Sequence, residues 1–192
     1  MKQKFILTLL LYSTMGFTQG YSITYSMEQF DKKGNLKTTI NTYLDGNQFN
    51  SIYEEDFKNS KSKGNEENLT LSYNENSIYF KDFKQKLLFY NDYIYFKNFE
   101  IQDNIELKKW EISTEKKYIL GYECQKATCQ FRGRIFIVFF TKEVSVSNGP
   151  WKLDGLPGLI LEAYSDDAIA SFKIIAQNIN LNKDNKNLKK CI

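Results

Sequence analysis

The chain has 192 residues, with 26 Lys and Arg against 23 Asp and Glu, and it contains no histidine. Its formal net charge of +3 is too small for the basic footprint of a nucleic-acid-binding protein, so we expect no nucleic-acid partner. Without histidine the chain has no Ser-His or Cys-His catalytic pair, no imidazole general base and few routes to a transition-metal site. We therefore predict a non-catalytic protein that uses no cofactor or metal.

Residues 1–18 have the pattern of a secretory signal peptide. Lys2 and Lys4 precede an apolar run from Phe5 to Leu11, and small or polar residues follow. The run is too short to span a bilayer core of about 30 Å, and no later segment is long and apolar enough to do so. We expect an exported protein, periplasmic or associated with the outer membrane, with one domain over residues 19–192. A buried N-terminal strand or helix is the alternative.

Alternating apolar and polar residues predict strands along most of the chain. Tyr21, Ile23, Tyr25 and Met27 alternate with polar residues, as in a strand with one buried face. Further strands are expected over residues 36–44, 48–53, 69–73, 77–81, 86–90, 93–97, 109–113, 121–131, 134–141, 159–164 and 169–179. Turn signals separate them, and Asp45-Gly46 is a strong hairpin signal.

Two segments depart from this pattern. Residues 54–68 are polar and charged, and they predict a solvated loop in which Glu54, Glu55 and Asp56 face water; a helix over 55–68 is the alternative. Residues 180–192 predict a frayed tail. The many short strands predict an all-β fold, either a curved antiparallel meander sheet or an open barrel, with little helix.

The loop at residues 149–158 is built from scarce residues. It holds both prolines of the chain and one of its two tryptophans. Residues 156–159, Leu-Pro-Gly-Leu, fit a type II turn with glycine at its third position. The loop is either a rigid corner that plugs one end of the core or a pre-organised binding loop. Its candidate residues are Pro150, Trp151, Gly155, Leu156, Pro157 and Gly158.

The only two arginines of the chain are Arg132 and Arg134. Because a guanidinium group binds carboxylates in bidentate fashion, we interpret the pair as a structural clamp on a carboxylate that fixes the neighbouring loop. Three carboxylates are candidates, those of Glu143, Asp154 and Glu162. The alternative is that the arginines grip an anionic ligand or an acidic partner.

Three cysteines are present, Cys124, Cys129 and Cys191. Cys124 and Cys129 are five residues apart in one predicted strand, so they face opposite sides, about 17 Å apart along the chain, and should not bridge each other. An exported protein meets an oxidising compartment, where Cys191 could bridge to either Cys124 or Cys129. Buried free thiols are the alternative for these two residues.

Three segments together resemble the GLPGLI family. They are residues 119–127 (Ile-Leu-Gly-Tyr-Glu-Cys-Gln-Lys-Ala), 131–134 (Phe-Arg-Gly-Arg) and 149–160, and residues 155–160 match the six-letter name motif in full. The resemblance extends over about residues 110–165. It implies an exported, β-rich envelope protein of Bacteroidota, and it supplies no agreed active site.

These features favour a binding function. Our first hypothesis is an envelope binding or chaperone-like module whose aromatic-rich concave face, near Trp151 and Leu156, takes a lipid or hydrophobic peptide. The second is a structural or accessory protein that docks an outer-membrane protein through strand edges or the 149–158 loop. An enzyme with an unrecognised site ranks third, because the sequence shows no nucleophile–base pair and no set of metal ligands.

Overall fold

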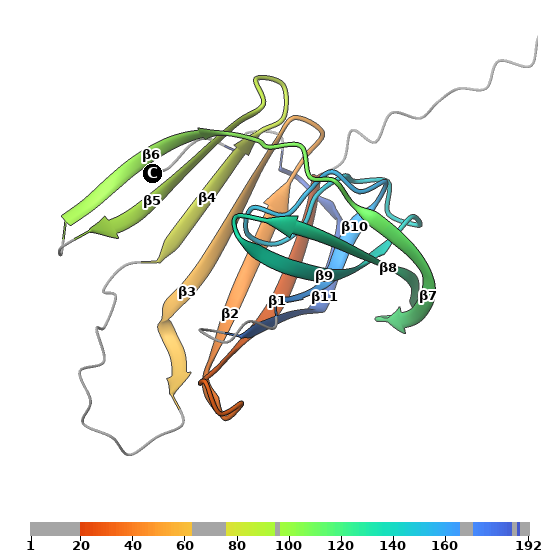
Figure 1. Cartoon of the computed structure of the whole chain (residues 1–192). Coiled ribbons are helices and arrows are strands. Elements are labelled where there is room, and N and C mark those ends of the chain that lie inside the picture. Colours follow the sequence, from red (N-terminus) through yellow and green to blue (C-terminus); the bar gives the residue numbers. More distant parts are fainter. Residues whose placement is uncertain (1–19, 63–75, 95–96, 166–170, 186–187, 189–192) are drawn as a thin grey trace, which may run out of the picture.

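The computed structural model describes residues 20–62, 76–94, 97–165, 171–185 and 188 (Figure 1). Its strands are β1 (Gly20–Phe30), β2 (Leu36–Gly46), β3 (Asn50–Ser62), β4 (Ser77–Asp82), β5 (Leu87–Ile94), β6 (Lys97–Asn104), β7 (Glu111–Ile119), β8 (Tyr122–Phe131), β9 (Arg134–Thr141), β10 (Leu159–Ser165) and β11 (Phe172–Lys183). The described residues form no helix, so the all-β prediction is confirmed. The predicted signal peptide and the strand expected at 69–73 lie outside the described residues.

The strands form one antiparallel sheet in the order β6-β5-β4-β3-β2-β1-β11-β10-β9-β8-β7. Strands β1 to β6 form a meander that runs outward from the middle of the sheet. Strands β7 to β11 form a second meander that runs back inward, and β11 pairs with β1. The two edge strands, β6 and β7, are therefore consecutive in the chain.

The short connector between β6 and β7 requires the sheet to curl. Only residues 105–110 join Asn104 to Glu111. An extended chain rises about 3.5 Å per residue, so these two ends lie within about 25 Å of each other. Eleven strands laid flat would measure about 48 Å across. The sheet therefore bends into an open trough, as Figure 1 shows, and its edges do not pair to close a barrel.

The concave face of the trough carries the core. Alternate side chains of β1 point inward and are buried, as predicted, including Tyr21, Tyr25 and Met27. The segment between β9 and β10 runs inside the trough, where its Leu153 and Leu156 are buried. The Tyr25 hydroxyl donates to the Ile160 carbonyl at 2.9 Å, which ties β1 to the start of β10, where this segment ends.

The hairpin turn after β2 differs from the prediction at Asp45-Gly46. Strand β2 continues through Gly46, which pairs with Tyr21, and the turn follows at residues 47–49. There the Asn47 side-chain oxygen accepts hydrogen bonds from the backbone of Phe49 and Asn50. A Cβ at position 46 would lie 2.2 Å from the Tyr21 ring, so glycine serves close packing here.

Two further predictions were wrong. The solvated loop expected from residue 54 is replaced by strand β3, which runs to Ser62, and the helix alternative fails over residues 55–62. The tail expected to fray from residue 180 stays in β11 to Lys183. Beyond it, the Asn185 side chain is buried and donates to the Tyr21 carbonyl at 2.7 Å.

Candidate functional site

A buried polar hub holds the 149–158 loop inside the trough. The ammonium group of Lys81, on β4, donates to the Asn148 side chain and to the Leu153 carbonyl, both at 2.8 Å. The Asn148 amide donates in turn to the Tyr21 hydroxyl at 2.8 Å. Burial lowers the pKa of Lys81 to about 7, and nearby Asp154 opposes that shift. The hub joins the N-terminal meander to a loop of the C-terminal meander.

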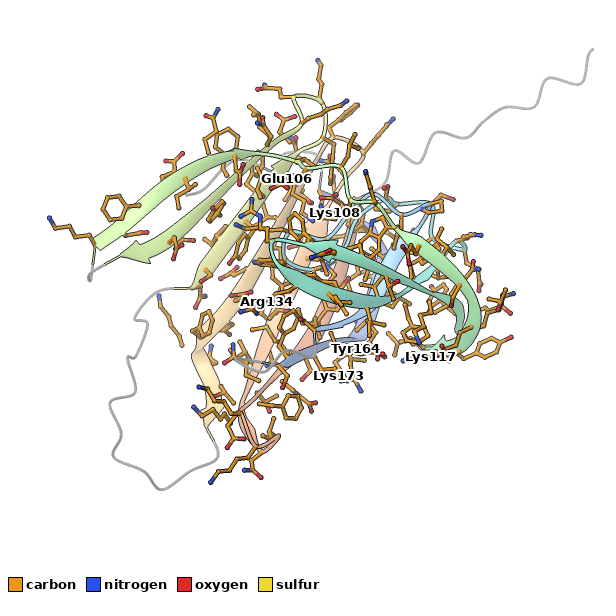
Figure 2. The ribbon with its side chains drawn as sticks, in the orientation of Figure 1. Glu106, Lys108, Lys117, Arg134, Tyr164 and Lys173 are labelled. Atoms are coloured by element: carbon orange, nitrogen blue, oxygen red, sulfur yellow. The ribbon has the colours of Figure 1, made fainter. Side chains whose placement is uncertain are left out.

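The connector between the sheet edges contacts the same loop. Lys108 forms an ion pair with Asp154 at 2.8 Å, and both side chains are buried. The Trp110 indole N–H donates to the Asp154 carbonyl at 2.9 Å. Figure 2 shows Lys108 and Glu106 on the connector, where the chain passes from one half of the trough to the other. The sequence pattern singled out neither Lys81 nor Lys108, because lysines are frequent and contacts distant in the chain leave no local signal.

The turn at Pro157 and Gly158 differs from the expected type II turn. The Gly158 N–H donates to the Leu156 carbonyl at 2.8 Å, and the Leu159 N–H donates instead to Val144 at 3.2 Å. A Cβ at position 158 would lie 2.0 Å from the carbonyl oxygen of Thr141. Glycine is therefore required here chiefly for the close approach of two backbone segments.

Arg132 pairs with two carboxylates outside the three predicted candidates, those of Asp103 and Glu106, the latter at 2.9 Å. The hydrogen bond from Arg132 lowers the pKa of Asp103. These contacts join the β8–β9 turn to β6 and the connector, across the two edges of the sheet. Arg134 opens β9 and lines the cleft described below.

The three carboxylates proposed as arginine partners have other contacts. Asp154 pairs with Lys108, and Glu162 pairs with Lys117 at 2.6 Å. Glu143 accepts the backbone N–H of Glu123 at 2.8 Å. Figure 2 shows Lys117 on the C-terminal half of the trough. Lysines therefore provide the ion pairs described for Asp154 and Glu162.

Cys124 and Cys129 are free and buried. They pack into different hydrophobic clusters, as expected from their odd separation in one strand. Burial raises the pKa of each thiol to about 11, which keeps both protonated at neutral pH. Cys191 lies outside the described residues, so a bridge from it to either cysteine stays a prediction.

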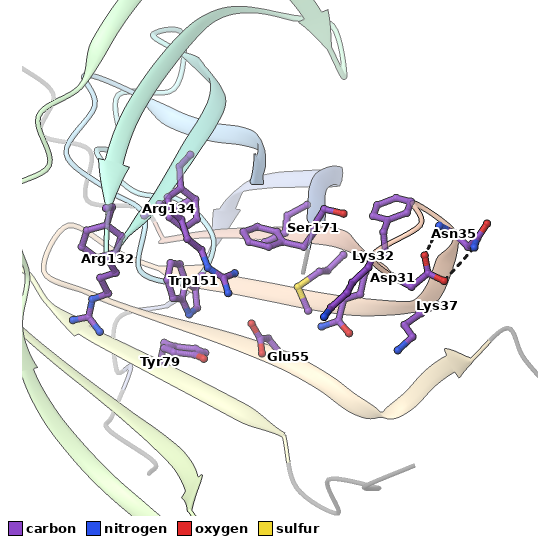
Figure 3. Close-up of a pocket in the computed structure, with 18 of the residues that line it drawn as sticks. Asp31, Lys32, Asn35, Lys37, Glu55, Tyr79, Arg132, Arg134, Trp151 and Ser171 are labelled. Carbon is purple, nitrogen blue, oxygen red and sulfur yellow. Dashed lines mark hydrogen bonds between the residues drawn. The ribbon is translucent and has the colours of Figure 1, made fainter. Parts of the chain in front are cut away.

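An open cleft of about 1090 Å³ lies along the concave face (Figure 3). One wall is aromatic. Trp151 stacks on Phe136 with ring centroids 5.6 Å apart, Phe131 meets Trp151 edge-on at 6.0 Å, and Phe172 lies 6.0 Å from Phe136. Trp151 thus joins the 149–158 loop to the cleft, and the loop contributes both to the core and to the cleft wall.

Glu55 lies on the other wall of the cleft and is 8% exposed. Figure 3 shows its carboxyl group facing the space below Trp151 and Arg134. No described residue donates a hydrogen bond to this carboxyl group or forms an ion pair with it. Burial raises the pKa of Glu55 to about 8, against the opposing charge of Lys152. Glu55 was expected to face water, and the structure corrects that expectation.

The β1–β2 turn supplies cationic groups to one end of the cleft. Lys32, Lys33 and Lys37 line it and are exposed, and no ion pair engages them among the described residues. The neighbouring carboxylate of Asp31 is occupied within its own turn, where it accepts hydrogen bonds from the backbone and the side chain of Asn35.

The described residues hold no group of three or more His, Cys, Asp or Glu side chains arranged for a metal ion. In the same ranges no helix has the length and hydrophobicity to cross a bilayer.

The fold and the cleft define an open all-β trough domain. A family model described as the N-glycanase peptide, N-terminal domain, matches residues 23–191, and the chain belongs to this family. Two crystal forms of PNGF-II share the fold at 20% identity and a TM-score of 0.56. Each match covers 84% of this chain but only 27% or 28% of the PNGF-II chain, so this chain spans about a quarter of that protein.

A putative outer membrane lipoprotein-sorting protein domain from Vibrio parahaemolyticus aligns at 8% identity over 86% of each chain, but its TM-score of 0.30 supports no conclusion. A search of curated proteins finds no match. The matching family differs from the GLPGLI family, and these comparisons leave that resemblance a prediction.

Proposed function

We propose that the protein is an exported, non-catalytic binding module of the cell envelope, and that the cleft receives an amphipathic or hydrophobic ligand such as a lipid or a hydrophobic peptide. The observation that carries the proposal is the cleft itself, an open space of about 1090 Å³ with an aromatic wall and the largely buried carboxyl group of Glu55 facing it. Ligand sites are typically concave, mostly apolar and provided with few polar groups.

Export is supported by the N-terminal sequence, where residues 1–18 have the pattern of a signal peptide. We place the protein in the periplasm or at the outer membrane. A partner protein of the outer membrane is the alternative to a small ligand. The absence of histidine from the whole chain supports a non-catalytic role.

A cleft-filling variant tests the proposal. Gln29 lies on β1 and lines the cleft, so Gln29→Trp should fill part of it, whereas Glu28→Trp alters the opposite face of the same strand. Protein purified from its native envelope should carry a bound lipid or peptide in native mass spectrometry. We expect Gln29→Trp to lose at least tenfold of that ligand and Glu28→Trp to keep it. Wild-type protein that carries no ligand but crosslinks to one dominant membrane protein would favour the docking alternative.

Family membership favours a second candidate function, a domain that holds a glycan for an N-glycanase. Trp151 offers a ring face on which a sugar could stack. Isothermal titration calorimetry with a free N-glycan distinguishes the two functions. Saturable binding that Gln29→Trp removes would support the glycan, and the absence of heat with the glycan beside binding of an amphiphile would support the first proposal.

A further inference from the structure

The chemistry of the cleft specifies more than an apolar ligand. Of the described side chains that line it and can carry a charge at neutral pH, Lys32, Lys33, Lys37, Arg132 and Arg134 are cationic, and Asp31 and Glu55 are acidic. The charge of Asp31 is satisfied within its own turn, and Arg132 is paired with carboxylates outside the cleft. The three lysines of the β1–β2 turn form no ion pair with any residue that the structure describes, and they favour an anion at this end.

The apolar part of the cleft begins next to these lysines. Met27 and Phe30 lie on β1, before the turn, and Phe172 and Ile174 lie on β11, which pairs with β1. Phe172 continues into the aromatic wall through Phe136. An elongated molecule with one charged end could thus place that end at the lysines and its body along this wall.

We propose that the cleft binds a single-chain amphiphile with an anionic headgroup, held with its head at Lys32, Lys33 and Lys37 and its apolar body against the wall formed by Phe172, Phe136 and Trp151. The inference rests on the proposed function, because it assigns a ligand class to the same cleft. The headgroup is a carboxylate or a phosphate, and both chemistries suit lysine ammonium groups.

Glu55 then has a role in the bound state. When a ligand fills the cleft it excludes water from the Glu55 carboxyl group, so the ligand must offer that group a hydrogen-bond partner. The ionisable groups that face Glu55 are Tyr53 on its own strand, Tyr79 on β4 and Lys152 in the loop, with Arg134 across the cleft. Because burial raises its pKa to about 8, Glu55 is mainly protonated at pH 7 and donates a hydrogen bond to a neutral oxygen of the ligand.

Four matched amphiphiles test the ligand class by isothermal titration calorimetry with the wild-type protein at pH 7. Decanoate and 1-decanoyl-glycerol-3-phosphate carry anionic heads, monodecanoylglycerol is neutral, and decyltrimethylammonium is cationic. We expect the tighter anionic probe to bind at least tenfold more tightly than the neutral and cationic probes. The affinities of the two anionic probes show whether the cleft prefers a carboxylate or a phosphate headgroup. Equal affinities, or a preference for the cation, would overturn the inference.

Two sets of variants locate the groups responsible. Replacing Lys32, Lys33 and Lys37 together by Gln should weaken the anionic probes at least tenfold. Replacing the exposed Lys84, Lys97 and Lys109 by Gln makes the same change in net charge outside the cleft and should leave affinity unchanged. Equal losses in both triple variants would show a nonspecific charge effect and overturn the assignment of the head.

Substitutions of Glu55 separate an anionic ligand from a cationic one. Glu55→Gln keeps a hydrogen-bond donor and should bind 1-decanoyl-glycerol-3-phosphate as well as wild type, whereas Glu55→Leu should bind it several-fold less tightly, because the ester oxygens lose their donor. Decanoate has no neutral oxygen, so both variants should bind it like wild type. A cationic ligand would require the carboxylate, so Glu55→Gln would no longer bind it.

If all four probes bind with equal affinity, the assignment of an anionic ligand is wrong and the proposed function stands. If none binds and the purified protein carries no ligand, both fail.

Discussion

Glu55 is the residue at which folding and binding conflict most directly. Its carboxyl group faces the cleft among aromatic side chains, and partial burial there makes the ionised form costly in the unliganded protein. Unpaired buried carboxyl groups are rare because the fold gains nothing from them, and they are common at sites that act on or hold a ligand. The position of Glu55 is therefore better explained by binding than by stability.

We expect Glu55→Gln to stabilise the unliganded protein in a pH-dependent way. The pKa of Glu55 rises from 4.5 in the unfolded chain to about 8 in the folded protein, so folding favours the protonated form. Its contribution is fully present below pH 4.5 and is lost as the pH rises through 8. The variant should match wild type at pH 4 and exceed it at pH 9 by roughly 2 to 4 kcal/mol in free energy of unfolding.

Urea denaturation at pH 4, 6 and 9 measures this difference. Glu28→Gln, on the opposite face of β1, two strands from β3, is the control and should track wild type. A difference for Glu55→Gln that stays constant with pH, or that favours wild type at pH 9, would show that the carboxyl group is solvated in solution.

At the scale of elements, the 149–158 loop acts as part of the core and as part of the cleft wall. Leu153 and Leu156 are buried in the trough, and Trp151 faces the cleft. Whether the loop is a rigid corner or a binding loop stays a prediction, but its local geometry differs from the expected type II turn, because Gly158 passes against the backbone of Thr141.

Substitutions in the loop should therefore differ in cost according to backbone proximity. Gly158→Val places a Cβ 2.0 Å from the Thr141 oxygen and should cost about 3 kcal/mol or more. Pro157→Ala should cost about 1 kcal/mol, chiefly through greater freedom of the unfolded chain. Gly133→Ala is the matched control, because its φ is +79° but its surroundings are open, and it should cost about 1 kcal/mol. Thermal melts compare the three, and equal shifts for Gly158→Val and Gly133→Ala would contradict the close-approach account.

The sequence predicted elements well where a local pattern decides them. The strands expected at 121–131 and 134–141 form and pair, and Arg132 and Gly133 between them both adopt positive φ, as a two-residue hairpin turn requires. The prediction failed where a distant partner decides. Gly46 continues a strand because the Tyr21 ring packs on it, and residues 54–62 form a strand because β2 pairs with them.

The same distinction explains what was found of the site. Trp151 stood out because tryptophan is scarce in the chain. Glu55 did not, because it resembled a charge in a polar loop. One signal was present, since the alternation of β3 places Glu55 on the same face as buried Ser51 and Tyr53. The cleft itself arises from curvature that no local pattern encodes.

At the scale of the whole molecule, two meanders are held together by the pairing of β1 with β11 and by contacts inside the trough. Lys81 is central to those contacts, because it lies on β4 of one meander and donates to Asn148 and Leu153 of the other. A buried ammonium group that satisfies several acceptors leaves them unpaired when it is removed.

We expect Lys81→Met to loosen both meanders together. Methionine fills a similar volume but donates no hydrogen bond, so the Leu153 carbonyl and the Asn148 side chain lose their donor at an expected cost of about 3 kcal/mol. Hydrogen exchange should then show lower protection in β4 and also in β9 and β10, which flank the loop. Lys84→Met changes an exposed lysine just beyond β4 and should alter neither. Loss of protection confined to β4 would mean that Lys81 does not couple the stability of the two halves of the trough.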